Sequence, residues 1–269
     1  MAGQPHARDA TQASDTSYAL VTGASKGLGK FFARALAKRK HNLVIVARSQ
    51  HKLEALANEL RNSQGILAEP VAFDLALPGA GLELAQQLRE RGFRIDLLVN
   101  NAGFGERGEF MQLSLERQLE MMQLNNRAVV ELTYQLLPSM LEAGGIINVS
   151  SMAGFQPVPY AALYSATKSF LTTFSMALRE ELRSSGVKVV TVCPGRLRAD
   201  PEDEASGQQR QKVPGGEQHH EDVVNLTLKK LDSGGGLLIP GRKNRLIVRG
   251  QRLISPNAVP KIVARLSRP

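Results

Sequence analysis

The amino-acid sequence predicts an α/β protein: one doubly wound domain with a mainly parallel sheet of about seven strands between two helix layers. Short apolar runs alternate with segments of helical spacing along most of the 269 residues. The strand-like runs are continuously apolar, which is typical of strands buried on both faces. Short connections of this kind favour right-handed crossovers in a single sheet, with ligands beyond the carboxyl ends of its strands.

The elements follow one another in a regular order. The first strand, residues 18–22, ends in a glycine-rich turn, and the helix after it begins at Gly27. Further strands are predicted at residues 42–47, 69–73, 95–99, 146–149, 187–192 and 237–239. Helices are predicted between them at residues 52–61, 82–91, 115–142 and 160–183.

Three segments flank or interrupt this pattern. Residues 1–16 are small and polar, so a disordered tail is expected there, and the α/β domain is placed at residues 17–241. Residues 198–222 are polar and lack apolar periodicity, which predicts a lid or a disordered segment with few apolar side chains. Residues 242–269 form a separate basic segment.

Composition excludes several classes of protein. The lone Cys193 cannot form an internal disulfide, which favours a reducing compartment. The sequence has neither a signal-peptide-like apolar run at its start nor about 18 consecutive apolar residues, so a cytoplasmic location is expected. His219 and His220 are adjacent in a polar stretch without a third spaced ligand, so we expect them to be solvated and predict no metal site.

The net charge of +9 is concentrated at one end of the chain. Residues 242–269 hold eight Lys and Arg and no Asp or Glu, which leaves about +1 (9 − 8) for the rest. Interleaved Leu, Ile and Val allow either a solvated rim or a weak peripheral membrane contact, although Pro256 and Pro260 interrupt any long helix. No aromatic residues accompany these cations, so a nucleic-acid partner is not expected.

The turn after the first strand has the spacing of a phosphate-binding loop. Its sequence, T-G-A-S-K-G-L-G from Thr22, places three glycines between a strand and a helix. Phosphate oxygens can reach backbone N–H groups where no Cβ intervenes, and the helix N-terminus adds partial positive charge. The turn therefore predicts a dinucleotide site, with an ordinary tight connection as the alternative.

The second strand ends without the acidic residue that would hold the ribose 2′-hydroxyl of NAD. Arg48 stands there instead, and Lys26 in the glycine turn supplies a second cation. Together they favour NADP(H) over NAD(H). The alternative is a pair of solvated surface cations.

A third group of residues is suited to proton transfer. Tyr164 and Lys168 are one helical turn apart, so they share a helix face, and Ser150 and Ser151 follow the fifth strand. A phenol with a pKa near ~10 is a poor acid or base at neutral pH, and the adjacent ammonium is expected to lower that pKa. In isolation the Tyr-Lys spacing is common in helices.

With these motifs in order, the sequence resembles the short-chain dehydrogenase/reductase family of Rossmann-fold, NAD(P)-dependent oxidoreductases. The resemblance covers roughly residues 18–195. Besides the motifs above, it rests on N-N-A-G from Asn100, on N-V-S-S from Asn148, on Asn125 ahead of Leu137-Pro138, and on the pairs Asp74-Leu75 and Pro194-Gly195.

The resemblance implies a catalytic tetrad of Asn125, Ser151, Tyr164 and Lys168. Asn126 competes with Asn125, which the spacing to Pro138 favours, and Ser151 is preferred to Ser150 by its distance from the tyrosine. Hydride would pass between the nicotinamide and a carbonyl or alcohol while Tyr164 acts as general acid or base. The implied cofactor shell comprises Gly23, Ser25, Lys26, Gly27, Leu28, Arg48, Asp74, Leu75, Asn101, Tyr164, Lys168, Pro194 and Gly195.

One departure from the family pattern supports a rival hypothesis. Many members have a threonine after the Pro-Gly turn that bonds the nicotinamide carboxamide, and Ala199 occupies that position here. The rival is a non-catalytic protein of the same fold that senses NADP(H) or scaffolds a partner. The family also implies a homodimer or homotetramer, assembled through the long helices predicted at residues 115–142 and 160–183.

Overall fold

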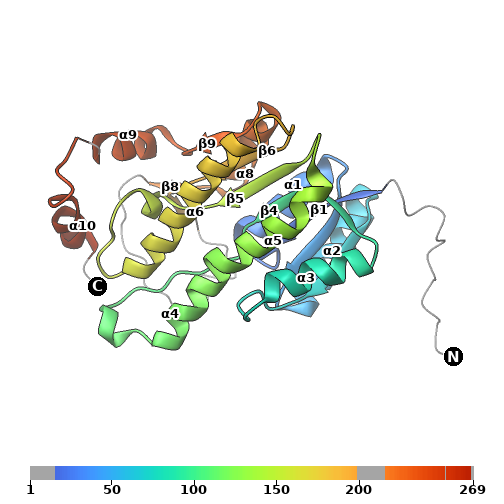
Figure 1. Ribbon diagram of the computed structural model, residues 1–269, viewed down its shortest axis with the longest axis horizontal. Helices are drawn as coiled ribbons and strands as arrows, with labels where there is room; N and C mark the ends of the chain where they lie inside the picture. The colour runs from blue at the N-terminus through green and yellow to red at the C-terminus, as the bar shows by residue number, and fades with distance from the viewer. Residues whose placement is uncertain (1–15, 199–215, 252, 268–269) are drawn as a thin grey trace.

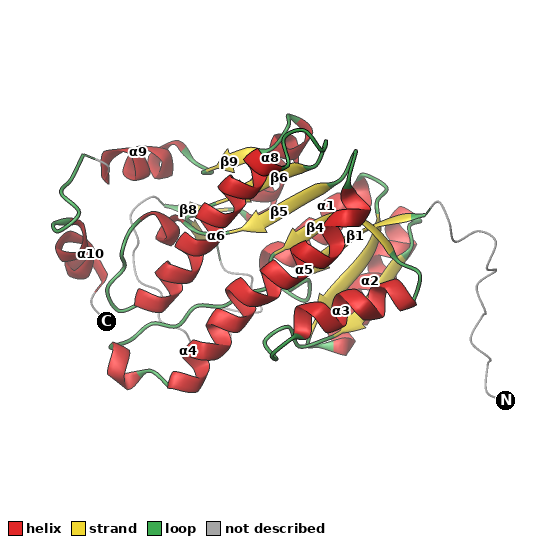
Figure 2. Ribbon diagram, in the orientation of Figure 1, coloured by secondary structure: helices red, strands yellow, loops and turns green. Residues whose placement is uncertain are grey.

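The computed structural model describes residues 16–198, 216–251 and 253–267. Its main sheet has seven parallel strands in the order β3-β2-β1-β4-β5-β6-β9. Figures 1 and 2 show β1, β4, β5 and β6 of this sheet among the helices. The strand order reverses between β1 and β4, which is where ligands bind in doubly wound sheets. The strands are β1 (Ser17–Thr22), β2 (Asn42–Ala47), β3 (Ala68–Ala72), β4 (Arg94–Asn100), β5 (Gly145–Val149), β6 (Lys188–Val192) and β9 (Gly236–Leu238).

Helices cover both faces of this sheet (Figure 1). On one face lie α1 (Gly27–Lys38), α2 (Gln50–Gln64) and α8 (His220–Asp232); on the other lie α3 (Ala80–Glu90), α4 (Leu115–Met122), α5 (Ala128–Leu136) and α6 (Ala162–Glu181). Neighbouring strand residues such as Leu20 and Val21 are fully buried in opposite core layers. Burial on both faces explains the continuous apolar runs and confirms the predicted fold class.

The two long helices differ from their predictions. Residues 115–140 are helical throughout, but a π-helical turn at Gln123–Arg127 lies between α4 and α5, and a 3-10 turn at Leu137–Met140 ends the helix before residue 142. The helix predicted from residue 160 begins instead at Ala162. Tyr160 has a φ of 65°. That left-handed conformation cannot belong to a right-handed helix.

Only the ends of the predicted lid lie within the described residues. At those ends β7 (Arg196–Leu197) pairs with β8 (Glu217–Gln218), and α8 begins at His220. The prediction that the lid extends to residue 222 is therefore wrong at its end, since a helix begins there. Residues 199–215, including Ala199, lie outside the described part, and so do residues 1–15 of the predicted tail.

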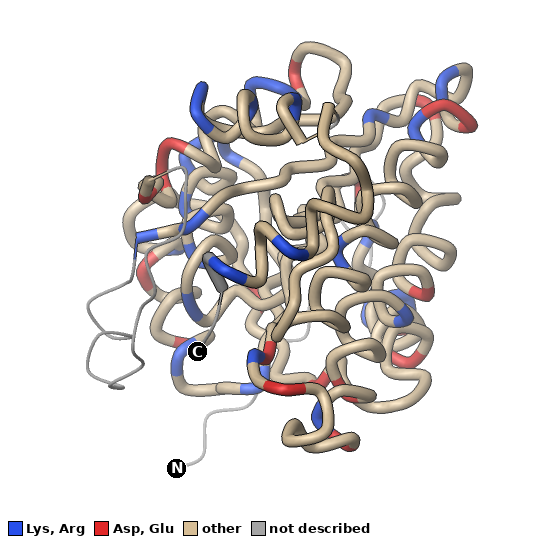
Figure 3. Tube along the Cα trace, turned by 90° about the vertical axis from the view of Figure 1, so that its left-hand side faces the viewer, with Lys and Arg blue, Asp and Glu red and all other residues tan. Residues whose placement is uncertain are grey.

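The basic segment at the end of the chain forms two helices, α9 (Arg242–Gln251) and α10 (Val259–Ser267). Pro256 lies between them and Pro260 in the first turn of α10, where proline is tolerated. Figure 3, viewed from the side on which these helices lie, shows basic positions along the chain in front. Within the described residues, no helix has both the length and the apolarity required to cross a bilayer.

Candidate active site

The carboxyl ends of the central strands open into a cleft of about 1260 Å³. Every residue predicted for the cofactor shell lines this cleft, as does Ser151. The position is the one expected from topology, because the turns that follow parallel strands meet at one edge of the sheet.

The glycine turn after β1 has the shape of a phosphate cradle. Gly23 has a φ of 66°, and a Cβ there would lie 2.9 Å from the Cα of Ala102. A Cβ at Gly27 would lie 3.9 Å from the Nε2 of His220, which is ordinary van der Waals contact. Asn101 follows β4, which lies beside β1 in the sheet. Its side chain donates to the Thr22 carbonyl at 2.9 Å and so fixes the turn. The N-terminus of α1 is thus held open to the cleft, and the turn fits a diphosphate.

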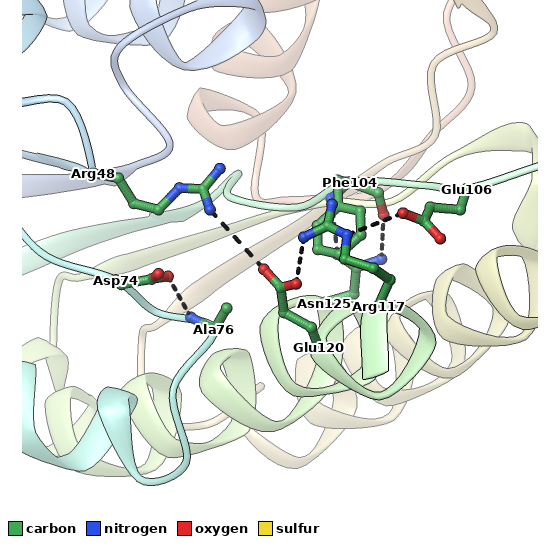
Figure 4. Close-up of polar contacts among 8 residues, drawn as sticks. All are labelled: Arg48, Asp74, Ala76, Phe104, Glu106, Arg117, Glu120 and Asn125. Carbon is green, nitrogen blue, oxygen red and sulfur yellow. Dashed lines mark hydrogen bonds and ion pairs between the residues drawn. The ribbon is translucent and has the colours of Figure 1, made fainter. Parts of the chain in front are cut away.

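Arg48 lines the cleft directly after β2 (Figure 4). Its Nη1 lies 4.0 Å from Oε1 of Glu120 on α4, and its side chain is 69% exposed. A pair this exposed contributes at most about 1 kcal/mol, so a stronger anion can displace Glu120. Below it, the Asp74 carboxylate accepts from the Ala76 N–H at 3.0 Å and holds the turn after β3.

The proposed acid, Tyr164, stands beside Lys168 on α6 and opposite Ser151 after β5. Ser151 and Tyr164 are joined by a side-chain hydrogen bond. The Lys168 Nζ donates to the Val149 carbonyl at 3.0 Å and lies 5.9 Å from the centroid of the Tyr164 ring. A Cβ at Gly105 would lie 2.6 Å from the Tyr164 ring, so a glycine lets the loop after β4 close over the ring.

The neighbouring serine has a different environment. The Ser150 hydroxyl is buried, donates to the Lys168 carbonyl at 2.8 Å and lies 2.7 Å from the Thr172 hydroxyl. It ties β5 to α6 and does not face the Tyr164 hydroxyl, whereas Ser151 does.

Asn125 lies in the π-helical turn, behind the cleft wall. Its side-chain amide donates to the Phe104 carbonyl at 2.9 Å and to the Thr167 hydroxyl at 3.1 Å, and its carbonyl accepts from the Phe104 N–H at 3.2 Å. Asn126 instead donates to the Thr167 carbonyl at 2.9 Å. Asn125 therefore joins the loop after β4 to the helix of Tyr164, and its place in the tetrad stays a prediction.

The protonation of Tyr164 differs from the expectation. The desolvated surroundings of its hydroxyl raise its pKa above the usual value, and the hydrogen bond with Ser151 only partly offsets this. The expected lowering by Lys168 is wrong for this structure. Burial lowers the pKa of Lys168 to about 8, so at neutral pH Lys168 is still mainly charged and Tyr164 also holds its proton.

Sequence reasoning missed two features of the site. The prediction that both histidines are solvated is wrong for His220, which is buried, stacks on Phe31 at a centroid distance of 5.0 Å and lines the cleft beside Gly27. The basic segment also reaches the site, because Ile247, Ile254 and Ile262 line a second cavity beside Tyr164. Among the described residues, no group of three or more His, Cys, Asp or Glu is placed to hold a metal ion.

Solved structures of similar shape include a short-chain dehydrogenase from Sphingobium yanoikuyae in complex with NADPH. It is 32% identical, with a TM-score of 0.77 over 88% of this chain and 94% of that one. L-sorbose reductase from Gluconobacter frateurii, solved with NADPH and L-sorbose, is 25% identical, with a TM-score of 0.73 over 84% of this chain and 97% of that one. A structure of a 7beta-hydroxysteroid dehydrogenase, at 23% identity and a TM-score of 0.81, covers 92% of this chain and 96% of its own and shows the fold alone.

Curated relatives align over a shorter region. Ketoacyl reductase HetN from Nostoc sp. is 40% identical over 65% of this chain and 62% of its own length. The human very-long-chain 3-oxoacyl-CoA reductase is 37% identical over 66% of this chain and 58% of its own. The alignments thus span less than two thirds of these relatives' own length.

The family model that matches the sequence is described as short chain dehydrogenase. It covers residues 17–210, which is most of the chain and includes the glycine turn, Ser151, Tyr164 and Lys168. The protein belongs to the short-chain dehydrogenase family of oxidoreductases.

Proposed function

We propose that the protein is an NADP(H)-dependent oxidoreductase that reduces a carbonyl substrate to the alcohol, or runs the reverse reaction, with Tyr164 as general acid or base. The observation that carries the proposal is that Ser151, Tyr164 and Lys168 line the same cleft as the glycine cradle. Two solved structures of similar shape are described as complexes with NADPH, and one of these also contains L-sorbose.

Each residue then has a defined task in reduction. The nicotinamide, when bound, supplies the hydride. Tyr164 donates its proton to the oxygen on which negative charge develops, and the Ser151 hydroxyl, hydrogen-bonded to Tyr164, stabilises the same oxygen. The ammonium of Lys168 stabilises the phenolate that remains on Tyr164. Burial raises the pKa of Tyr164, so the phenol holds its proton at neutral pH and can donate it in carbonyl reduction.

The rival hypothesis, a non-catalytic NADP(H) sensor or scaffold, predicts binding without turnover. The test is to incubate the protein with NADPH and a panel of ketones and aldehydes and to follow NADPH absorbance. We expect oxidation of NADPH with at least one class of carbonyl. Normal NADPH affinity in calorimetry with no turnover on any substrate supports the rival.

Arg48 provides a test of cofactor choice. We expect Arg48→Asp to weaken NADPH binding about 10- to 100-fold, because a charge-assisted contact to the 2′-phosphate is worth roughly 1.5–3 kcal/mol. Binding of NADH, which lacks that phosphate, should change by less than about threefold. Dissociation constants for both cofactors, measured by the fluorescence of the reduced nicotinamide, check this result.

The matched control is Arg183→Asp, which makes the same charge change just beyond the end of α6 at a side chain that is 80% exposed. It should leave both constants unchanged. Equal losses for NADPH and NADH in Arg48→Asp would contradict a role for Arg48 in reading the phosphate.

Exposed apolar side chains on α4 and α6 support a homo-oligomer. Leu119 is 54% exposed and Phe170 46% exposed, and Phe170 stacks on Phe174 at a centroid distance of 6.0 Å. We expect a dimer or tetramer in sedimentation velocity, and we expect Phe170→Arg to shift it to a smaller species. Leu82→Arg on α3, at a side chain that is 42% exposed, is the control and should not change the distribution.

A further inference from the structure

A second cavity, of about 600 Å³, adjoins the cofactor cleft. Ser151, Tyr164 and the Pro194-Gly195 turn line both spaces, so the two meet at the proposed acid. A carbonyl held there faces Tyr164 from one side while the rest of its molecule extends into the second cavity. The volume of the second cavity lies in the range of pockets that enclose a drug-sized ligand.

The walls of this cavity are mostly aliphatic. One side is formed by residues that follow β5, including Met152, Ala153 and Val158. The other side is formed by α9 and α10, and its aliphatic residues are Ile247, Ile254, Val259, Ile262 and Val263. Two of the polar groups that also line it are already engaged, since Gln251 donates to the Phe155 carbonyl at 3.1 Å and Arg196 pairs with Glu217 at 3.3 Å.

The C-terminal helices are held against the catalytic domain. Asn244 on α9 is 1% exposed, and its side chain packs so closely on Gly195 that a Cβ there would lie 2.6 Å from the Asn244 amide nitrogen. Gln251 ties the other end of α9 to Phe155. The wall formed by α9 is therefore anchored at both ends of the cavity.

The same anchoring explains the mixed composition of this basic segment. Ile247 is partly buried and lines the cavity, Ile262 lines it at 44% exposure, and Arg245, Arg249 and Lys261 are exposed. The segment is amphipathic because one face encloses the cavity and the other faces solvent. Two other apolar residues of the segment do not line the cavity. Leu246 is 67% exposed and Leu253 is 90% exposed.

We infer that α9 and α10 form the outer wall of the substrate site, and that the substrate is a ketone bearing a long or bulky aliphatic group which fills this cavity. The inference rests on the proposed function, because it places the carbonyl at Tyr164. A small polar ketone leaves the aliphatic walls hydrated, whereas each buried methylene adds binding free energy.

The first test is the rate of NADPH-dependent reduction of methyl ketones with ethyl, hexyl and decyl chains. We expect kcat/KM to rise about threefold to fourfold per added methylene until the cavity is filled, which is the factor that burial of one methylene supplies. Equal kcat/KM values across the series overturn the inference.

Two variants on α9 separate the wall from the rest of the helix. Ile247→Asp places a carboxylate in the cavity, and Leu246→Asp makes the same change at a neighbouring residue outside it. We expect Ile247→Asp to lower kcat/KM for the decyl ketone more than tenfold and to leave the ethyl ketone within about twofold, while Leu246→Asp changes neither. Equal effects of the two variants overturn the inference.

Val263→Asp repeats the test from α10, and melting temperatures identify any variant that does not fold. Calorimetry of the decyl ketone with protein saturated in NADP⁺ gives a readout without turnover. Binding that is lost in Ile247→Asp supports the cavity even if no ketone is reduced, and in that case the proposed function alone fails. Absence of binding in the wild type overturns the inference.

Discussion

Replacing Tyr164 with Phe should lower kcat for carbonyl reduction by about 10³-fold, within the 10²- to 10⁴-fold range that a positioned general acid contributes. The substitution removes the proton donor and leaves the ring, so packing against the Gly105 loop is kept. NADPH affinity should change by less than about threefold, because the glycine cradle and Arg48 are untouched. Single-turnover absorbance measurements and calorimetry check the two parts separately.

Tyr160→Phe is the matched control for this result. Tyr160 precedes α6 and lines neither the cofactor cleft nor the second cavity. The same loss of a hydroxyl there should leave kcat within about twofold of the wild type. A Tyr164→Phe enzyme that keeps full activity would remove Tyr164 from the mechanism, and a wild type without activity would favour the sensor hypothesis.

The sequence was sufficient to predict the frame that brings these residues together. The apolar run at residues 42–47 coincides with β2, and the predicted starts of the other strands lie within one residue of those observed. Such runs are decided locally, because a parallel strand covered by helices on both faces has to be apolar throughout. Once the strands are parallel, Ser151 after β5 and Arg48 after β2 necessarily lie at the same edge of the sheet.

Properties that depend on tertiary packing could not be predicted in this way. The spacing of Tyr164 and Lys168 predicts a shared helix face, but the pKa of Tyr164 depends on how far the Gly105 loop and β5 exclude water from its hydroxyl. His220 was expected to be solvated because its sequence neighbours are polar. It is buried because the start of α8 brings it against Phe31 of α1.

The contacts of the C-terminal segment likewise could not be predicted from the sequence alone. Interleaved cations and aliphatic residues predict an amphipathic surface, but they do not say what the apolar face covers. Contact of Asn244 with Gly195 decides this, since it places Ile247 in the wall of the cavity that Ser151 and Tyr164 also line. In the structure, residues of this segment line the second cavity beside Tyr164.

Lys168→Met should abolish most of the activity and at the same time remove a pH dependence of stability. Lys168 is 6% exposed, its ammonium donates to the Val149 carbonyl, and its pKa is lowered to about 8. At a separation near 6 Å, a cation stabilises a phenolate by about 3 kcal/mol at an effective dielectric constant of about 20. Loss of that interaction lowers kcat about 100-fold. In the wild type, reduction should therefore slow as the pH rises through about 8 and Lys168 loses its charge.

The stability of the wild type changes with pH in the opposite direction to its rate of reduction. Because the pKa of Lys168 is about 8 in the folded protein, below its value of 10.5 in the unfolded chain, folding disfavours the charged form. Between these two pKa values the unfolded state binds more protons, so the free energy of unfolding contributed by Lys168 rises with pH. The penalty for burying the charge is fully present below about pH 8 and is relieved as the pH approaches 10.5.

Urea unfolding of the wild type and of Lys168→Met at two pH values isolates the contribution of Lys168 to the free energy of unfolding. The stability of the variant relative to the wild type should fall by about 2 kcal/mol between about pH 7 and about pH 9.5, because only the wild type gains from deprotonation. Lys188→Met, at an exposed lysine at the start of β6, is the control and should show no such change. A pH-independent difference for Lys168→Met would mean that Lys168 keeps an ordinary pKa. The slowing of reduction above about pH 8 would then need another titrating group.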